Sequence, residues 1–461
     1  MSLSVCERIM PKYVVFNTVN YDGVGDFAHF KDIMLALLAN RIFKDVEFTA
    51  IVAINCSRTR ARYDSIHDEL KSLGIQFYYG DIDEHIEILS KDKDLQKELQ
   101  QADQAIIISF DNISSLYEPY FKKNIPIKLI GEHECVVAGA GFRDFPLNQN
   151  HSLGLKQGFE GIKIKNNPHL SPQEAWNIIE THHPEFSAQL LNHTGSDDFE
   201  SFYKKNMLVP AYFNTPHDFE RLVNVFIKNQ SLSGEKNIIF FQSGFKYSDY
   251  LDSPDFRHGL TEKWLVGSKV AKIDLLMPAN APLQFAGNQA ESKTISIFAG
   301  FYLLDPAFDA IYQLAKVAGV SGDNSLERAI SMDILPIYWS TNAVNKIGTI
   351  HALREITQSL DIPQEAKEAF NIFFRYSPFE APVAHINFQD MIKAWPTVTH
   401  YLRTHKNFYN KLEDIVLKDL PLKPSLDTRS ITTDVKQKLQ ASKEDDNLSK
   451  TDKPSGGLSN M

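Results

Sequence analysis

Apolar runs of strand length alternate with amphipathic stretches of helix length in the first part of this chain. β-Branched and aromatic residues dominate five such runs, at residues 13–19, 47–56, 75–80, 104–110 and 125–131. Runs that are apolar on both faces are typical of strands in a parallel sheet that helices cover on both sides. The pattern therefore predicts an α/β fold built on a parallel sheet.

A second series of the same kind follows later in the chain. Its apolar runs lie at residues 237–244, 272–277, 294–301, 317–322 and 334–339, with helical stretches at residues 305–316 and 325–332. Two such series predict two Rossmann-like domains.

The segment between the two series carries five prolines and two helix-like stretches, at residues 171–183 and 216–230. We place the domain boundary in its last part, which predicts one domain at residues 1–225 and a second, with closing C-terminal helices, at residues 226–420. Residues 421–461 contain few apolar side chains, so we expect them to form a disordered tail.

Composition narrows the functional classes. The formal net charge of the chain is −10, which disfavours nucleic acid as a partner because binding to a phosphate backbone needs clustered Lys and Arg. Cys6, Cys56 and Cys135 are scattered, a pattern that indicates a reducing compartment rather than disulfides or zinc. No apolar run has the length of a membrane span or a signal-peptide core. We therefore expect a cytoplasmic protein with no integral membrane segment.

Two carboxylates follow the first predicted strand. Asp22, Gly25 and Asp26 lie on a turn before a predicted helix, and His29 lies on the first turn of that helix. Ligands of open α/β sheets bind at this edge of the strands, where a carboxylate is suited to act as a general base. A plain Asp-Gly turn with Asp26 as the helix N-cap is the structural alternative. The dinucleotide fingerprint G-x-G-x-x-G is incomplete, because Ala28 stands at its third glycine.

A polar turn, Ser321-Gly322-Asp323-Asn324-Ser325, lies between a predicted strand and a predicted helix. The free N–H groups of a helix N-terminus bind anions such as a diphosphate. The hydroxyls of Ser321 and Ser325 are suited to add hydrogen bonds, and Asp323 to contact sugar hydroxyls or to cap the helix. The turn therefore predicts a nucleotide-sugar site that needs no metal, with an ordinary helix cap as the alternative.

Two further loops follow predicted strands. The loop that begins near Gln242 and Ser243 contains Gly244, which lets the backbone approach a phosphate, and Tyr247, which is suited to stack on a base or to pack in the core. Glu132 and His133 follow another strand and are candidates for the cleft. We expect no metal site there, because His133 lacks a second pair of ligands.

The layout and the two motifs resemble glycosyltransferases of the two-domain B-type fold (GT-B) and, more narrowly, the protein-arginine rhamnosyltransferase family. Asp22 and Asp26 match that family's D-x-x-G-D loop. Gly322 and Ser325 match its G-E-D-S loop, with Asp323 in place of Glu and an asparagine in place of Asp. The resemblance implies two Rossmann-like domains that face each other across a cleft, an N-terminal acceptor domain and a C-terminal nucleotide-sugar domain. It also implies inversion at the anomeric carbon.

These observations predict a metal-independent, inverting glycosyltransferase for hexosyl or deoxyhexosyl groups, with no cofactor besides the nucleotide-sugar donor. Residues 321–325 would stabilise the leaving nucleoside diphosphate, while Asp26 or Asp22 deprotonates the acceptor. The acceptor stays open and includes a protein side chain. A nucleotide-sugar epimerase and a non-catalytic GT-B-like binding protein are the alternatives. The polar tail fits either a linker or the export signal of a bacterial effector that is secreted into a host cell.

Overall fold

The computed structural model describes most of the chain in discrete ranges. They are residues 10–19, 25–54, 60, 71–109, 113–122, 125–131, 150–167, 169–229, 231–232, 234, 236–244, 268–278, 282–287, 291, 293–303, 305–338, 347–375 and 385–418. Residues 1–416 form one unit and residues 417–461 a second one. The tail predicted at residues 421–461 lies outside the described residues.

The first sheet has six strands, all parallel. They are β1 (Lys12–Val19), β2 (Glu47–Ile54), β3 (Gln76–Gly80), β4 (Gln104–Ile108), β5 (Ile127–Gly131) and β6 (Asn150–Ser152). Their spatial order, β3-β2-β1-β4-β5-β6, is that of a doubly wound Rossmann sheet, in which the strand order reverses between the first and the fourth strand. The five runs predicted from the sequence are the first five strands.

Helices pack on this sheet through the apolar residues of its strands. They are α1 (Gly25–Ala39), α3 (Ile82–Lys91), α4 (Lys93–Gln101) and the short α5 (Ser114–Tyr117), with two 3-10 turns, η1 (Arg41–Phe43) and η2 (Glu118–Tyr120). Phe30, Ile33 and Leu37 repeat at helical spacing on α1, and all three are fully buried. Leu95 and Leu99 of α4 join strand residues in a core cluster.

The second sheet has seven strands in the order β10-β9-β11-β8-β7-β12-β13. They are β7 (Asn206–Tyr212), β8 (Asn237–Ser243), β9 (Val270–Leu276), β10 (Leu283–Ala286), β11 (Lys293–Ala299), β12 (Val317–Val320) and β13 (Leu335–Tyr338). All neighbours pair parallel except β10, which runs antiparallel to β9 at the edge. The strand order reverses between β7 and β12.

Strand β7 was not predicted, and it changes the domain limits. Its residues pair with β8 on one side and with β12 on the other, so the second sheet begins before the predicted boundary at residue 225. The sequence hides this strand because Pro210 lies inside it, and proline is rare in central strands. The ladder to β12 starts only after Pro210, at Ala211, so the missing N–H of the proline is tolerated.

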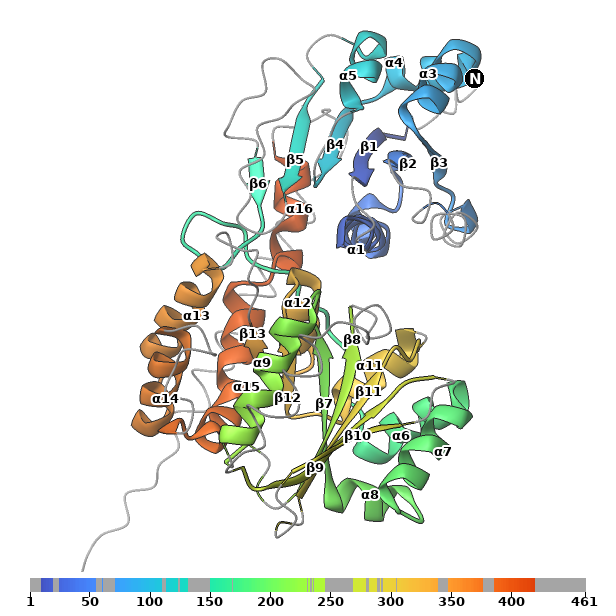
Figure 1. The fold of residues 1–461 in the computed structure, drawn as a ribbon. Coiled ribbons are helices and arrows are strands. Elements are labelled where there is room, and N and C mark those ends of the chain that lie inside the picture. The colour runs from blue at the N-terminus through green and yellow to red at the C-terminus, as the bar shows by residue number, and fades with distance from the viewer. Residues whose placement is uncertain are drawn as a thin grey trace, which may run out of the picture. The chain divides into compact units, whose positions relative to one another are not determined.

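The two faces of the second sheet carry different helices (Figure 1). One face packs on α6 (Pro172–His182), α7 (Pro184–Thr194), α8 (Phe199–Lys205) and α11 (Asp305–Gln313). The core on the other face includes α9 (Pro216–Lys228), α12 (Asp323–Ser331), α13 (Ile347–Ser359), α14 (Gln364–Arg375) and α15 (Phe388–His405). Ile239 and Phe241 face the first group, while Ile238 and Phe240 face the second, as the alternation of a strand requires. The predicted α/β class with two parallel-sheet domains and C-terminal helices is confirmed.

Candidate functional site

Three strands of the second sheet bring the predicted donor loops to one edge. β7 lies between β8 and β12, with Tyr212 opposite both Ser243 and Val320. The carboxyl ends of these strands therefore lie side by side, where β7 and β12 mark the reversal of strand order. Open α/β sheets bind ligands at such a position. The loops at residues 242–244 and 321–325, far apart in the sequence, thus belong to one candidate site.

The loop after β8 is fixed to the end of β7 by the backbone. The N–H of Phe213 donates to the carbonyl oxygen of Ser243 at 3.1 Å. Gly244 has φ +105°, and a Cβ atom there would lie 2.2 Å from the Phe213 carbonyl oxygen, so only glycine fits. Gln242, near the end of β8, is fully buried. Tyr247 lies outside the described residues.

The side chains of the turn after β12 are engaged within the protein. Ser325 Oγ accepts from the Gly322 N–H at 3.1 Å and donates to the Gly322 carbonyl oxygen at 2.7 Å. Asp323 Oδ1 accepts a 2.9 Å hydrogen bond from the hydroxyl of Tyr338, and Ser321 is 1% exposed. Ser325 thus caps α12 and Ser321 is buried; hydrogen bonds from these two hydroxyls to a ligand stay a prediction.

The backbone at the start of α12 is the part of this turn that suits an anion. Gly322 is the N-cap residue, and it has no side chain to accept from the first-turn N–H groups. The first intrahelical hydrogen bond runs from the Leu326 N–H to the Gly322 carbonyl oxygen. The ring of Tyr212 lies nearby, 3.4 Å from the position of a Cβ on Gly322. A helix N-terminus beside an aromatic ring is suited to a nucleotide diphosphate.

A buried lysine, which the sequence did not single out, contacts the start of α12. Lys163 Nζ donates to Asn324 Oδ1 at 3.0 Å and lies 3.2 Å from Glu327 Oε2. The side chain of Lys163 is 1% exposed and that of Glu327 is 5% exposed. Asn324, predicted to bind the donor, thus directs its side-chain oxygen toward Lys163.

The first sheet places part of the second candidate loop. Gly25 and Asp26 are the first two residues of α1. The side chain of Asp26 lies outside the described residues, as do Asp22, Glu132 and His133. His29 is buried on the same helix, at 4% exposure, and so does not face a solvent-filled cleft. At the neighbouring strand end, Ser109 has φ +64° and is buried, a strained position of the kind that occurs near functional sites.

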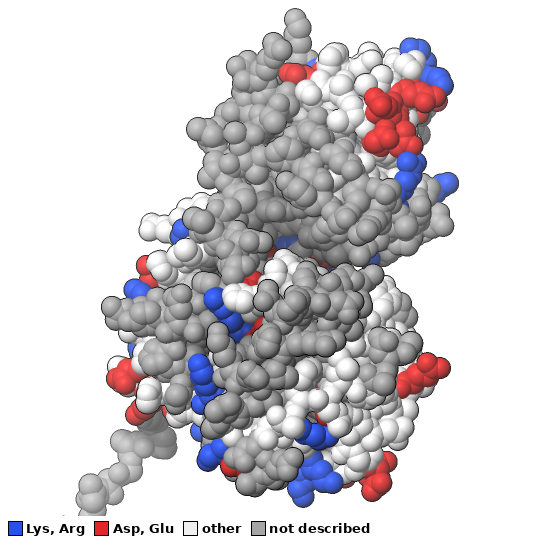
Figure 2. Space-filling model, in the orientation of Figure 1, with Lys and Arg blue, Asp and Glu red and all other residues white. Residues whose placement is uncertain are grey.

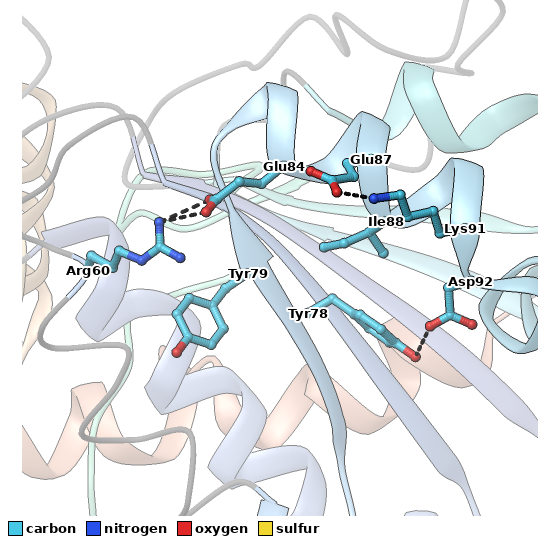
Figure 3. Close-up of a pocket in the computed structure, with 8 residues that line it drawn as sticks. All are labelled: Arg60, Tyr78, Tyr79, Glu84, Glu87, Ile88, Lys91 and Asp92. Carbon is cyan, nitrogen blue, oxygen red and sulfur yellow. Dashed lines mark hydrogen bonds and ion pairs between the residues drawn. The ribbon is translucent and has the colours of Figure 1, made fainter.

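A separate hollow of about 470 Å³ lies between β3 and α3 (Figure 3). Its charged groups pair with one another: Arg60 Nη1 lies 2.8 Å from Glu84 Oε1, and Lys91 pairs with Glu87. Burial, with Asp92 beside it, raises the pKa of Tyr78 to about 12, so this hydroxyl stays protonated at neutral pH. The charged groups of this hollow are thus engaged with partners within the chain.

Comparison with known proteins supplies similar folds but no family. No protein-family model and no curated protein matches the chain. Among solved structures, EarP, in a study of arginine glycosylation of translation elongation factor EF-P, is 11% identical (89% of this chain and 99% of that chain, TM-score 0.41). The apo lipopolysaccharide outer core galactosyltransferase WaaB is 10% identical (89% and 100%, TM-score 0.43). UDP-GlcNAc 2-epimerase from Neisseria meningitidis is 10% identical (86% and 100%, TM-score 0.36).

Glycosyltransferases and an epimerase thus occur among the similar structures. These likenesses are distant, and the function is argued below from the residues of this chain.

Charge and membrane features add little to the site. In Figure 2 acidic side chains gather in the region that Figure 1 labels α3 and α4, with basic side chains beside them. Of the helices that the structure describes, none combines the length and apolar character needed to cross a bilayer. Within the same described ranges, no group of three or more His, Cys, Asp or Glu side chains is placed to hold a metal ion.

Proposed function

We propose that this protein is a glycosyltransferase that moves a sugar from a nucleotide-sugar donor to an acceptor, with inversion and without a metal. The observation that carries the proposal is the meeting of three strand ends at one edge of the second sheet, with the N-terminus of α12 beside Tyr212. A diphosphate bound there would interact with the positive end of the helix dipole.

In the proposed reaction the acceptor loses a proton to Asp26 and attacks the anomeric carbon of the sugar. The bond between that carbon and the diphosphate oxygen breaks, and its electron pair leaves with the nucleoside diphosphate. The N–H groups at the start of α12 stabilise the charge that develops on the leaving group, which is the role otherwise given to a metal ion. Asp26 is proposed for the base because it lies in the first turn of α1, which follows β1 at the carboxyl edge of the first sheet.

The carboxylate role is tested by replacing Asp26 with Asn. Nucleoside diphosphate release is measured with a panel of nucleotide sugars and with cell peptides as acceptors, while mass spectrometry follows the peptides. With the wild-type protein we expect nucleoside diphosphate release and a peptide that gains the mass of a sugar. With Asp26→Asn we expect the rate to fall at least about 100-fold, since a general base contributes about 10²–10⁴-fold to the rate. Nucleotide binding should be retained. Equal rates for the two proteins would reject Asp26.

The same assay separates the proposal from other activities. Conversion of the sugar nucleotide to a second isomer, with no diphosphate release, would identify an epimerase and overturn the transferase. Binding of a nucleotide sugar without turnover on any acceptor would instead indicate a non-catalytic protein. The peptide that gains the sugar mass would identify the acceptor, for which a protein side chain is one candidate.

A further inference from the structure

A single buried ammonium group contacts both helices to which the proposed function assigns a role. Lys163 Nζ lies within 3.0 Å of Asn324 Oδ1 and 3.2 Å of Glu327 Oε2, both on α12. It also lies 3.6 Å from Asp32 Oδ2 on α1. The fully buried ammonium group therefore has partners on the helix that carries Asp26 and on the helix whose N-terminus is the proposed donor site.

The backbone on either side of Lys163 is held firmly, which fixes where the ammonium can lie. The Lys163 N–H donates to Glu327 Oε1 at 2.9 Å. Ile162 and Ile164 make backbone hydrogen bonds to the segment around Asn407: the Ile162 N–H donates to the Lys406 carbonyl oxygen, and the Asn407 side chain bonds Ile164 on both of its backbone groups. The lysine thus lies on a segment clamped between α12 and the start of α16 (Tyr409–Leu417).

The positive charge of Lys163 lies beside two carboxylates, those of Glu327 and Asp32, and a second ammonium group, that of Lys165, pairs with Asp32. Glu327 and Asp32 are both carboxylates, with side chains 5% and 17% exposed, and burial of an uncompensated charge is costly. Burial, with the two carboxylates close by, raises the pKa of Tyr409, which keeps that neighbouring hydroxyl neutral. Lys165, two residues along, is half-exposed and pairs with Asp32 Oδ1 at 2.7 Å.

From this geometry we propose that Lys163 is a positioning residue that links the donor-binding helix α12 to the base-bearing helix α1. The inference rests on the proposed function for its catalytic meaning, but the link itself is a property of the contacts. On the α12 side, Lys163 holds Asn324 and Glu327 and so orients the N–H groups that face the diphosphate. On the α1 side, Lys163 pairs with Asp32 and so holds α1, whose first turn contains the proposed base.

The two sides of the link have different kinetic signatures. Loss of the α12 contacts displaces the diphosphate site, so we expect the donor KM to rise at least tenfold. Loss of the α1 contact displaces the base, so we expect kcat to fall at least tenfold with little change in the donor KM. A purely structural lesion, which lowers the fraction of folded enzyme, would lower kcat, leave the donor KM unchanged and raise exchange throughout the second sheet rather than in α12 and α1 alone.

The test is hydrogen–deuterium exchange of full-length protein, which needs no ligand, followed by donor kinetics. The variants are Lys163→Met with Glu327→Gln, which removes the buried charge pair together, and Asp32→Asn, which leaves that pair in place. Lys165→Met is the matched control, because Lys165 also pairs with Asp32 but its ammonium is half-exposed. We expect the double variant to raise exchange in peptides from α12 and α1, and Asp32→Asn to raise exchange in α12 as well as in α1.

The control should leave α12 exchange at the wild-type level. Unchanged exchange in α12 for both the double variant and Asp32→Asn would overturn the link, as would a uniform rise over the whole second sheet. If the double variant does not fold, the Asp32→Asn variant tests the link alone. Raised exchange in α12 peptides of that variant supports the link, and unchanged exchange there overturns it. If exchange is linked as expected but neither pyrophosphate nor any nucleoside diphosphate binds the wild-type protein, the positioning link stands and the proposed function fails.

Discussion

Gly244 lies so close to Phe213 that a Cβ atom on the glycine would be 2.2 Å from the Phe213 carbonyl oxygen. The adjoining Phe213 N–H donates to the carbonyl oxygen of Ser243. This contact joins the end of β7 to the loop after β8, and it sets the edge of the second sheet at which we propose that the donor binds. It requires both a positive φ and the absence of a side chain.

Replacing Gly244 with Ala should destabilise the protein by roughly 2–4 kcal/mol, because it adds backbone strain to a steric clash with a main-chain oxygen. Denaturant unfolding measures the change. Gly195→Ala is the matched control, since Gly195 has φ +61° and a Cβ atom added there would meet no atom within 4 Å, so it should lose only about 1–2 kcal/mol. Equal losses of unfolding free energy for the two variants would show that the clash with Phe213 does not add to the destabilisation.

The hydrogen bond from Tyr338 to Asp323 should stabilise the start of α12. The Tyr338 side chain is buried and its hydroxyl lies 2.9 Å from a carboxylate oxygen. We expect Tyr338→Phe to cost about 1.5–3 kcal/mol, the usual value for a hydrogen bond to a charged group, as measured by thermal or denaturant unfolding.

Tyr312→Phe provides the control for that variant. The Tyr312 hydroxyl is buried and has no hydrogen-bond partner within the described part of the chain. Its removal should therefore be neutral or stabilising. A loss of stability as large as that of Tyr338→Phe would contradict the role given to the Asp323 contact.

Stability should fall in mild acid because of His85. Burial is the main cause that lowers the pKa of His85 below 6.5, against smaller opposing effects of the Val52 carbonyl and of Glu84 and Asp81. Its ring accepts from Tyr117 and donates to Val52, which suits the neutral form. The unfolded chain binds the proton of His85 more readily than the folded chain does. The stability that neutral His85 gives the folded state is therefore complete above pH 6.5 and is lost as the pH falls through the folded-state pKa.

The effect is measured as the free energy of unfolding between about pH 5 and 8, a range that spans the ordinary histidine pKa of about 6.5. His85 should add a component that rises with pH across the lower part of the range, against the opposite component of Glu220, whose pKa burial raises to about 7. The slope should be smaller in His85→Gln, which keeps polar atoms but does not titrate. An identical slope in both proteins would remove His85 as the cause.

Metal removal provides a direct test of the leaving-group role of α12. If the helix N-terminus stabilises the diphosphate, transfer should proceed at the same rate after dialysis against a chelator, within about twofold. Activity that is lost on chelation and restored by a divalent cation would show that a metal carries that role.

The sequence predicted most of those strands that are buried on both faces of their sheet. Strands such as β4 and β8 are short apolar runs rich in β-branched and aromatic residues, a combination that is typical of buried parallel strands. Strand β7 was missed because Pro210 disguises it, and β10 because it is short and mostly exposed at the edge of the sheet. The consequence was a domain boundary placed later than the start of the second sheet.

The site was readable only in part, because its contacts join distant segments. The glycines at residues 244 and 322 were found by their position after predicted strands. Lys163 gave no signal, since a lysine between isoleucines is ordinarily exposed, and the partners of its buried ammonium group on α12, Asn324 and Glu327, lie 161 and 164 residues away. The same contact explains why Asn324, chosen as a donor ligand from the sequence, has its oxygen turned to a protein partner.

The central claim, that a nucleotide diphosphate binds at the start of α12, is tested most directly by a thermal-shift screen of the full-length protein. The panel contains UDP, dTDP, GDP, CDP, ADP and their sugars at millimolar concentration, and a Gly322→Val variant, with a side chain directed at Tyr212, is run beside the wild type. The account predicts that one base selectively raises the unfolding midpoint of the wild-type protein, as binding to the native state alone requires, and that Gly322→Val loses the rise. No rise with any nucleotide, or a rise that Gly322→Val retains in full, would contradict it.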